Sequence, residues 1–141
     1  MSELQLRVVT PQSIVMERKV QGVSFYGVDG SYGILPAHAA LMTATKPGVV
    51  TITELDGSTE DMIVTDGFAE MRDNVLSLIC EAGELAGEID LERAAEAEAR
   101  AREQIAQSSN VDVNLPKAEA ALQRALLRQM LGRKRSGSGH I

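Results

Sequence analysis

The chain has 141 residues, of which 44% are hydrophobic and only 3% aromatic, with no tryptophan. This length accommodates one compact domain with a small appendage and excludes a large multidomain enzyme. Scarce aromatic side chains argue against stacking surfaces for nucleic acid. The net charge of −6 is uneven, because residues 1–87 carry 12 acidic and 5 basic side chains. We therefore expect neither nucleic acid nor an anionic membrane as the partner of this part.

Residues 1–87 have the short hydrophobic period of β-strands. Residues 4–8 alternate between apolar and polar side chains, and residues 49–53 are rich in β-branched residues, which suit a pleated surface. Turn-forming residues recur at intervals of roughly 8 to 12 residues. They are Pro11, Asp29-Gly30, Pro36, Pro47-Gly48, Asp56-Gly57, Asp66-Gly67 and Asp73-Asn74. This spacing predicts an all-β sandwich or barrel.

Two local features refine this expectation. Residues 51–64 are predicted to form a hairpin, because Asp56-Gly57 readily takes the positive φ values that such a turn needs. The single cysteine, Cys80, lies in the apolar run 75–80. We expect it to be a buried structural side chain and not a nucleophile, and no intrachain disulfide can form.

We expect neither a membrane span nor a signal peptide, since no apolar run approaches about 18 residues.

After Gly87 the composition changes to that of helices, with alanine, glutamate and arginine dominant. Asp90 is the predicted N-cap of a helix over 91–106. Residues 107–114 are predicted to be a loop. A second helix is predicted from Pro116, which is tolerated at the first helical position, to Leu131, with Gly132 as its stop. Residues 133–141, with Arg133-Lys134-Arg135, read as a disordered tail.

The two predicted helices carry small apolar faces that suit an antiparallel hairpin. The faces consist of Ala94, Ala97, Ala101 and Ile105 on the first helix, and of Ala118, Ala121, Leu122, Ala125 and Gln129 on the second. Alanines bury little area, so we expect the hairpin to be only marginally stable and able to change conformation. The predicted fold is thus an all-β sandwich N-terminal domain (1–87) followed by a C-terminal antiparallel α-helical hairpin (88–132).

Candidate chemistry is sparse. The histidines are His38 and His140, and no nucleophile, base or metal-ligand spacing surrounds His38 or Cys80. We therefore predict no catalytic residue and no metal site, with His38 a structural or contact residue. The glycines of 27–33 lack a following Gly-Lys-Ser/Thr and are interpreted as a turn. Arginines at helical spacing (Arg93 with Arg100, Arg124 with Arg128) can meet a phosphate, although such spacing more often marks a solvated face.

Taken together, these motifs resemble the epsilon subunit of the F-type rotary ATP synthase, of the bacterial or plastid type, over nearly the whole chain. The resemblance rests on the order and spacing of five segments. They are Thr10-Pro11, Gly33-Ile34-Leu35-Pro36-Ala37-His38-Ala39, Lys46-Pro47-Gly48-Val49, Asp66-Gly67-Phe68 and Ile89-Asp90-Leu91-Glu92-Arg93-Ala94.

The resemblance implies a non-catalytic subunit of the central stalk. Its β-sandwich would bind the gamma subunit and the c-ring, with Asp29, Ser31, Tyr32 and His38 as candidate contacts, and would couple rotation to catalysis. Its hairpin would fold against the sandwich or extend into the alpha/beta hexamer, where it resists ATP hydrolysis. The subunit would lie on the cytoplasmic face of the bacterial inner membrane, or its plastid stromal equivalent, without inserting into the membrane.

In some bacterial members of this family the Ile-Asp-x-x-Arg-Ala motif is part of a site for regulatory ATP, with or without Mg. No cofactor is required. The positions that match that site here are Glu84, Ile89, Asp90, Arg93, Ala94, Arg100, Arg124 and Arg128.

The chain departs from the family pattern at Ala37, where the family usually has glycine, and also at Ala40 and Ser31. Two alternatives of other classes remain: a free-standing ATP-sensing domain of an unrelated enzyme, and a small hydrolase or transferase that uses His38.

Overall fold

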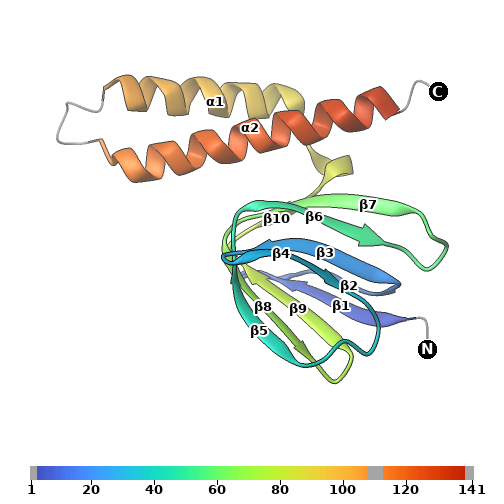
Figure 1. Ribbon diagram of the computed structural model, residues 1–141. Helices are drawn as coiled ribbons and strands as arrows, with labels where there is room; N and C mark the ends of the chain where they lie inside the picture. Colours follow the sequence, from blue (N-terminus) through green and yellow to red (C-terminus); the bar gives the residue numbers. More distant parts are fainter. Residues whose placement is uncertain (1–2, 108–112, 139–141) are drawn as a thin grey trace. The chain divides into compact units, whose positions relative to one another are not determined.

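The computed structural model describes residues 3–107 and 113–138. The chain divides into two compact units (Figure 1). We call Met1–Leu85 the β-unit and Ala86–Ile141 the helical unit. The boundary lies two residues before the Gly87 expected from the sequence, and the all-β domain followed by a helical hairpin is confirmed.

The β-unit is a sandwich built from one continuously hydrogen-bonded sheet. In the described residues the sheet has ten strands, in the order β10-β7-β6-β3-β5-β8-β9-β1-β2, with β4 paired to β3. They are β1 (Leu4–Val9), β2 (Ile14–Val20), β3 (Gly22–Gly27), β4 (Gly30–Ile34), β5 (Leu41–Thr45), β6 (Gly48–Thr53), β7 (Thr59–Val64), β8 (Gly67–Arg72), β9 (Val75–Cys80) and β10 (Gly83–Leu85). The pair Gly27↔Thr45 joins the two layers. Strands β1 and β9 pair in parallel.

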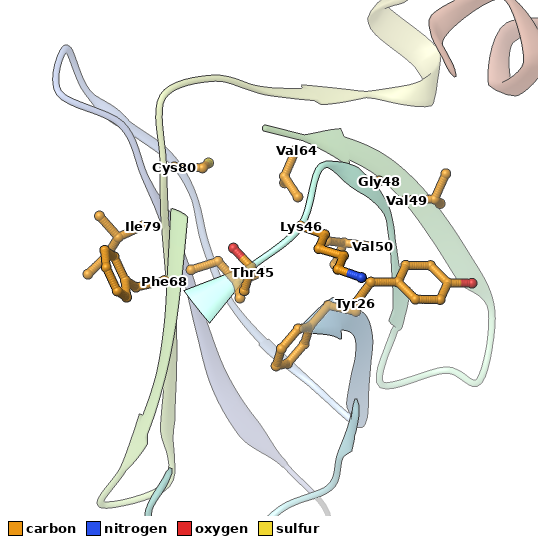
Figure 2. Close-up of a pocket in the computed structure, with 12 residues that line it drawn as sticks. Tyr26, Thr45, Lys46, Gly48, Val49, Val50, Val64, Phe68, Ile79 and Cys80 are labelled. Atoms are coloured by element: carbon orange, nitrogen blue, oxygen red, sulfur yellow. The ribbon is translucent and has the colours of Figure 1, made fainter. Parts of the chain in front are cut away.

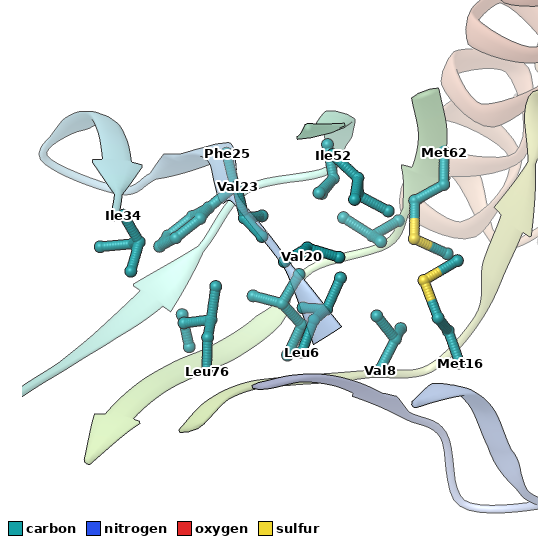
Figure 3. Close-up of a cluster of buried hydrophobic side chains, with 14 of the residues drawn as sticks. Leu6, Val8, Met16, Val20, Val23, Phe25, Ile34, Ile52, Met62 and Leu76 are labelled. Atoms are coloured by element: carbon teal, nitrogen blue, oxygen red, sulfur yellow. The ribbon is translucent and has the colours of Figure 1, made fainter. Parts of the chain in front are cut away.

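The core lies between the layers and is almost entirely aliphatic. Alternate residues of each strand point inward, as in β1, where Leu4, Leu6 and Val8 are buried. Figure 3 shows the Met16 and Met62 sulfur atoms facing each other across this core. Each fully buried aliphatic side chain contributes about 1.5–3 kcal/mol, and Phe25 is the buried aromatic residue that adds to this core.

Hairpin turns fix the register between strands. The predicted hairpin over 51–64 is confirmed by the pairing of β6 with β7. Its loop spans residues 54–58, where Gly57 has φ +89° and the Asp56 carboxylate accepts bonds from the Ser58 N–H (2.9 Å) and hydroxyl (2.6 Å). Between β8 and β9, Asp73 and Asn74 both have positive φ, which is typical of a tight two-residue turn.

The helical unit begins with a 3-10 turn (Ala86–Glu88), followed by α1 (Leu91–Ala106) and α2 (Leu115–Ser138). The bounds of α1 are those predicted. The Asp90 carboxylate caps α1 by accepting bonds from the Glu92 and Arg93 N–H groups at 3.0 and 3.2 Å. Of the predicted loop 107–114, residues 108–112 lie outside the described residues.

The predicted bounds of the second helix are wrong at both ends. Helix α2 begins at Leu115, and Asn114 is its cap, because the Asn114 side chain accepts a bond from the Lys117 N–H at 3.2 Å. Pro116 is therefore the second helical residue. Gly132 is not a stop: a Cβ there would lie 2.6 Å from Leu91 Cδ2, so glycine permits close packing and the helix continues. Residues 133–138 are helical, and not a disordered tail, whereas 139–141 lie outside the described residues.

Candidate functional sites on the β-unit and the helical unit

An apolar row crosses the outer surface of five neighbouring strands in the β-unit. The register aligns Ala44 (β5), Phe68 (β8), Ile79 (β9), Val9 (β1) and Ile14 (β2) side by side. Phe68, Ile79 and Ile14 are 56%, 46% and 52% exposed. Figure 2 shows Phe68 and Ile79 together, on the side of their strands away from Val50 and Val64. We call these five residues the apolar row.

The β3–β4 turn extends the apolar row. The Val28 N–H donates to the Ala44 carbonyl at 3.0 Å, and the Val28 side chain is exposed. Beside the row, the next register line begins with the exposed Met42 on β5 and continues with Glu70, Ser77 and Arg7, so this border is polar along β8, β9 and β1. A contiguous exposed apolar strip with a polar border is the usual form of a protein-binding surface.

Gly67 allows strands β8 and β9 to lie close together beneath the apolar row. A Cβ on Gly67 would fall on the carbonyl oxygen of Ile79, a backbone atom that cannot yield without breaking the pairing. Asp66-Gly67-Phe68 was recognised as a motif from the sequence, but the apolar row was not. The local signal for the row is an apolar residue at a strand position that would otherwise carry a polar, outward-facing side chain, as at Phe68 and Ile79.

The four predicted contact residues do not form one site. Asp29, Ser31 and Tyr32 lie at the β3–β4 turn, where the Tyr32 hydroxyl donates to the Asp29 carboxylate at 3.0 Å and the Tyr32 ring stacks on Phe25. His38 follows the other end of β4, about 15 Å away along a five-residue strand. It is exposed, and its Nδ1 lies 2.8 Å from the Ala39 carbonyl.

The loop that carries His38 is fixed by Asn74. The Ala37 N–H donates to Asn74 Oδ1 at 2.9 Å, and Asn74 Nδ2 donates to the Glu3 carbonyl at 3.0 Å. Ala37 itself has φ +64°, a conformation that favours glycine. Ala37 is therefore a strained residue, at a position where glycine would adopt the same left-handed conformation without steric cost.

The end of the sandwich near the apolar row holds no ligand chamber. The cavity between the layers there has a volume of about 10 Å³ and is lined by residues that include Tyr26, Thr45 and Lys46 (Figure 2). That volume corresponds to roughly one water molecule. Cys80 at its inner wall is buried, and desolvation raises the pKa of its thiol above the ordinary value. Burial and a raised pKa both make a thiol unreactive, as expected from the sequence.

In the helical unit, α1 and α2 run antiparallel and pack through a seam of small residues (Figure 1). Ala94 and Ala101 on α1, and Ala118, Ala125 and Gln129 on α2, are buried in the chain. These are members of the two faces predicted from the sequence. Alanine side chains bring the helix axes close but each removes little apolar area from water.

The four candidate phosphate-binding arginines lie along one edge of this hairpin. Arg93, Arg100, Arg124 and Arg128 each directly precede a buried seam residue: Ala94, Ala101, Ala125 and Gln129. Because the helices are antiparallel, residues that precede the seam on both helices share an edge. Arg93 and Arg100 are exposed, and Arg124 and Arg128 are half-buried.

The remaining candidate ATP-site residues have other positions. Ile89 and Asp90 precede α1, and the Asp90 carboxylate is occupied by the helix cap. Ala94 is buried in the seam. Glu84 lies on β10 in the β-unit, paired with Ile63. The candidate set therefore draws on both units. Among the described residues, no three histidine, cysteine, aspartate or glutamate side chains gather to hold a metal ion.

Comparisons with known proteins match both units. Residues 3–86 match the family model for the beta-sandwich domain of the ATP synthase delta/epsilon chain, and residues 88–128 match the model for its long alpha-helix domain. The chain is 38% identical over 125 residues to an ATP synthase epsilon chain of Nitratidesulfovibrio vulgaris strain DP4, covering 89% of this chain and 92% of the relative. It is also 38% identical over 126 residues to the ATP synthase epsilon chain of Halalkalibacterium halodurans, covering 89% and 93%.

A solved structure has the same fold. A chain in the Euglena gracilis mitochondrial ATP synthase complex of OSCP, F1 and c-ring superposes with a TM-score of 0.73 at 21% identity, covering 92% of this chain and 80% of that one. Neither helix in the described part of our chain is long and apolar enough to span a membrane. The two family models match the β-unit and the helical unit in order, and the chain therefore belongs to the ATP synthase delta/epsilon chain family.

Proposed function

We propose that the chain is the epsilon subunit of an F-type rotary ATP synthase, a non-catalytic part of the central stalk that couples rotation to catalysis and restrains ATP hydrolysis. The observation that carries this proposal is the match of one family model to each compact unit. The β-unit then is the docking part and the helical unit the regulatory part. In this role the chain works on the cytoplasmic face of the membrane, or the stromal face in a plastid.

The apolar row is the surface we assign to the gamma subunit. It crosses five strands and exposes Phe68, a large side chain of the kind that anchors protein interfaces. The β3–β4 turn with Asp29 adjoins this row, and we assign the turn to the c-ring. His38 lies at the opposite end of β4, so it contacts a different partner surface from Asp29.

Gamma binding tests this assignment. The variant Phe68→Glu places a charge in the apolar row, and we expect it to weaken binding to the purified gamma subunit about thirtyfold or more. Leu55→Glu is the matched control. Leu55 is an exposed leucine in the loop between β6 and β7, and neither of these strands is part of the apolar row. Equal affinity of both variants for gamma, measured by calorimetry, would remove the apolar row from the interface. Failure of the wild-type chain to bind gamma at all would instead favour the free-standing ATP sensor.

Regulatory ATP is the second part of the proposal, and the arginine edge of the hairpin supports it. Four guanidinium groups on one edge offer charge-assisted hydrogen bonds to a phosphate chain. We expect calorimetry to detect ATP binding, with or without Mg, and Arg93→Ala to weaken it at least tenfold. Arg72→Ala, an exposed arginine of β8 with the same charge change, is the control. No binding at millimolar ATP would leave these arginines as surface charges.

A further inference from the structure

The seam between α1 and α2 contains one buried polar side chain. Gln129 is 6% exposed and stands among the seam alanines. Its Nε2 donates to Glu98 Oε1 on the facing helix at 2.6 Å. A buried amide left without a partner is unfavourable, so this bond across the seam matters to the packing of the hairpin.

Two arginines complete the network. Glu98 Oε2 accepts a bond from Arg102 Nε at 2.7 Å, and Gln129 Oε1 accepts one from Arg133 Nη2 at 3.1 Å. Hydrogen bonds from Gln129 and then Arg102 hold the pKa of the Glu98 carboxyl below its ordinary value, so the network keeps this carboxylate charged. Arg102 and Glu98 belong to α1, Arg133 and Gln129 belong to α2, and the bond from Gln129 to Glu98 joins the two helices.

The alanines of the seam do not define its register by themselves, although Gly132 fits closely against Leu91 near one end of the seam. Alanines recur at three- and four-residue intervals on both helices, so a shift of one helical turn would again place alanine against alanine. A polar pair in an otherwise uniform seam selects one register, because any shifted arrangement leaves the polar groups buried without partners. The Glu98–Gln129 pair is the polar contact in this seam that a shift cannot reproduce, and the close contact of Gly132 with Leu91 is its apolar counterpart.

We propose that the Glu98–Gln129 pair is a register lock, and that its breakage is the step that opens the hairpin. Both residues are positioning residues. They hold α1 against α2 and thereby hold the four arginines of the opposite edge at their spacing. The lock itself depends only on the hairpin, whereas its effect on hydrolysis rests on the proposed function.

The test exchanges the two residues in the full-length chain. Gln129→Glu places two carboxylates in contact, whereas the swap Glu98→Gln/Gln129→Glu restores an amide-to-carboxylate bond with the original net charge. Gln123→Glu is the control, because Gln123 is an exposed residue of α2 and the charge change is the same. Amide hydrogen exchange measures hairpin opening, with the amides of β9 as an internal reference.

We expect Gln129→Glu to speed exchange in α1 and α2 about tenfold, while the swap returns exchange to within about threefold of wild type. Gln123→Glu should stay within about threefold. The lock is overturned if Gln129→Glu and Gln123→Glu have the same exchange rates in α1 and α2, or if the swap leaves exchange as fast as in Gln129→Glu. It is also overturned if amide exchange in β9 speeds up as much as exchange in the helices. If exchange changes as expected but the rate of ATP hydrolysis by the reconstituted enzyme is the same with all three variants as with wild type, the lock stands and the regulatory role fails.

Discussion

At the scale of single residues, glycine is required where backbones meet and is dispensable where they do not. Gly67→Ala would push a Cβ onto the Ile79 carbonyl, so we expect a loss of about 2–3 kcal/mol in unfolding free energy. Gly33→Ala is the control, because a Cβ on Gly33 meets nothing within 4 Å. Denaturant unfolding of both variants checks this. Equal midpoints would mean that β8 and β9 can separate without cost.

The left-handed conformation of Ala37 gives a second residue-scale prediction. Ala37→Gly should raise the unfolding free energy by about 0.5–1 kcal/mol, because glycine adopts φ +64° without steric cost. Ala39→Gly should lower it slightly, since φ of Ala39 is not positive and glycine there only adds freedom to the unfolded chain. Opposite signs in thermal unfolding support the strain at Ala37, and the same sign in both would refute it.

At the scale of elements, the β-unit has its own core and should fold alone. A chain that ends at Gly87 keeps all of the core strands β1–β9 and the cluster of buried residues between the layers. We therefore expect one cooperative thermal transition. Far-ultraviolet circular dichroism, which reports the loss of β-structure, measures it. A non-cooperative melt of this shortened chain would show that the sandwich depends on residues beyond 87.

Elements whose signals are local could be predicted from the sequence, and those that depend on distant pairing could not. Helix α1 was predicted with its cap because Asp90 and the alanine pattern lie within one continuous segment. The apolar row was missed because it requires the register of β1 with β9, whose residues are about 70 positions apart. Gly132 was wrongly predicted to end the second helix. Glycine is needed there because the Leu91 side chain of the other helix leaves no room for a Cβ, and this contact is not visible in the local sequence.

At the scale of the whole molecule, the division into two units allows the proposed docking and regulatory roles to be tested separately. Deleting residues from 88 onward leaves the apolar row intact, so we expect assembly and ATP synthesis to persist in the reconstituted enzyme. ATP hydrolysis should rise, because a marginally stable hairpin that blocks the hexamer by population shift is gone. Hydrolysis rates at low and high ATP measure this. Unchanged rates at both would leave the chain with a coupling role alone.

The candidate ATP site marks the limit of sequence reasoning at this scale. Its arginines were predicted as two pairs, one on each helix, and the antiparallel packing places all four on one edge. The family pattern also supplied Glu84, which helical spacing cannot reach because it belongs to β10. Glu84 therefore entered the candidate set through the family resemblance alone, whereas the four arginines could be selected from helical spacing.

The parallel pairing of β1 with β9 sets the order of events during synthesis. The β1–β2 hairpin can form as soon as residue 20 emerges, but the other edge of β1 must wait for residues 75–79. At about 5–20 residues per second, synthesis from residue 20 to residue 79 takes roughly 3 to 12 s, and the edge stays open for that time. An open strand edge is a template for pairing with another chain. Until β9 has emerged, the free edge of β1 can therefore pair with a strand of a neighbouring nascent chain.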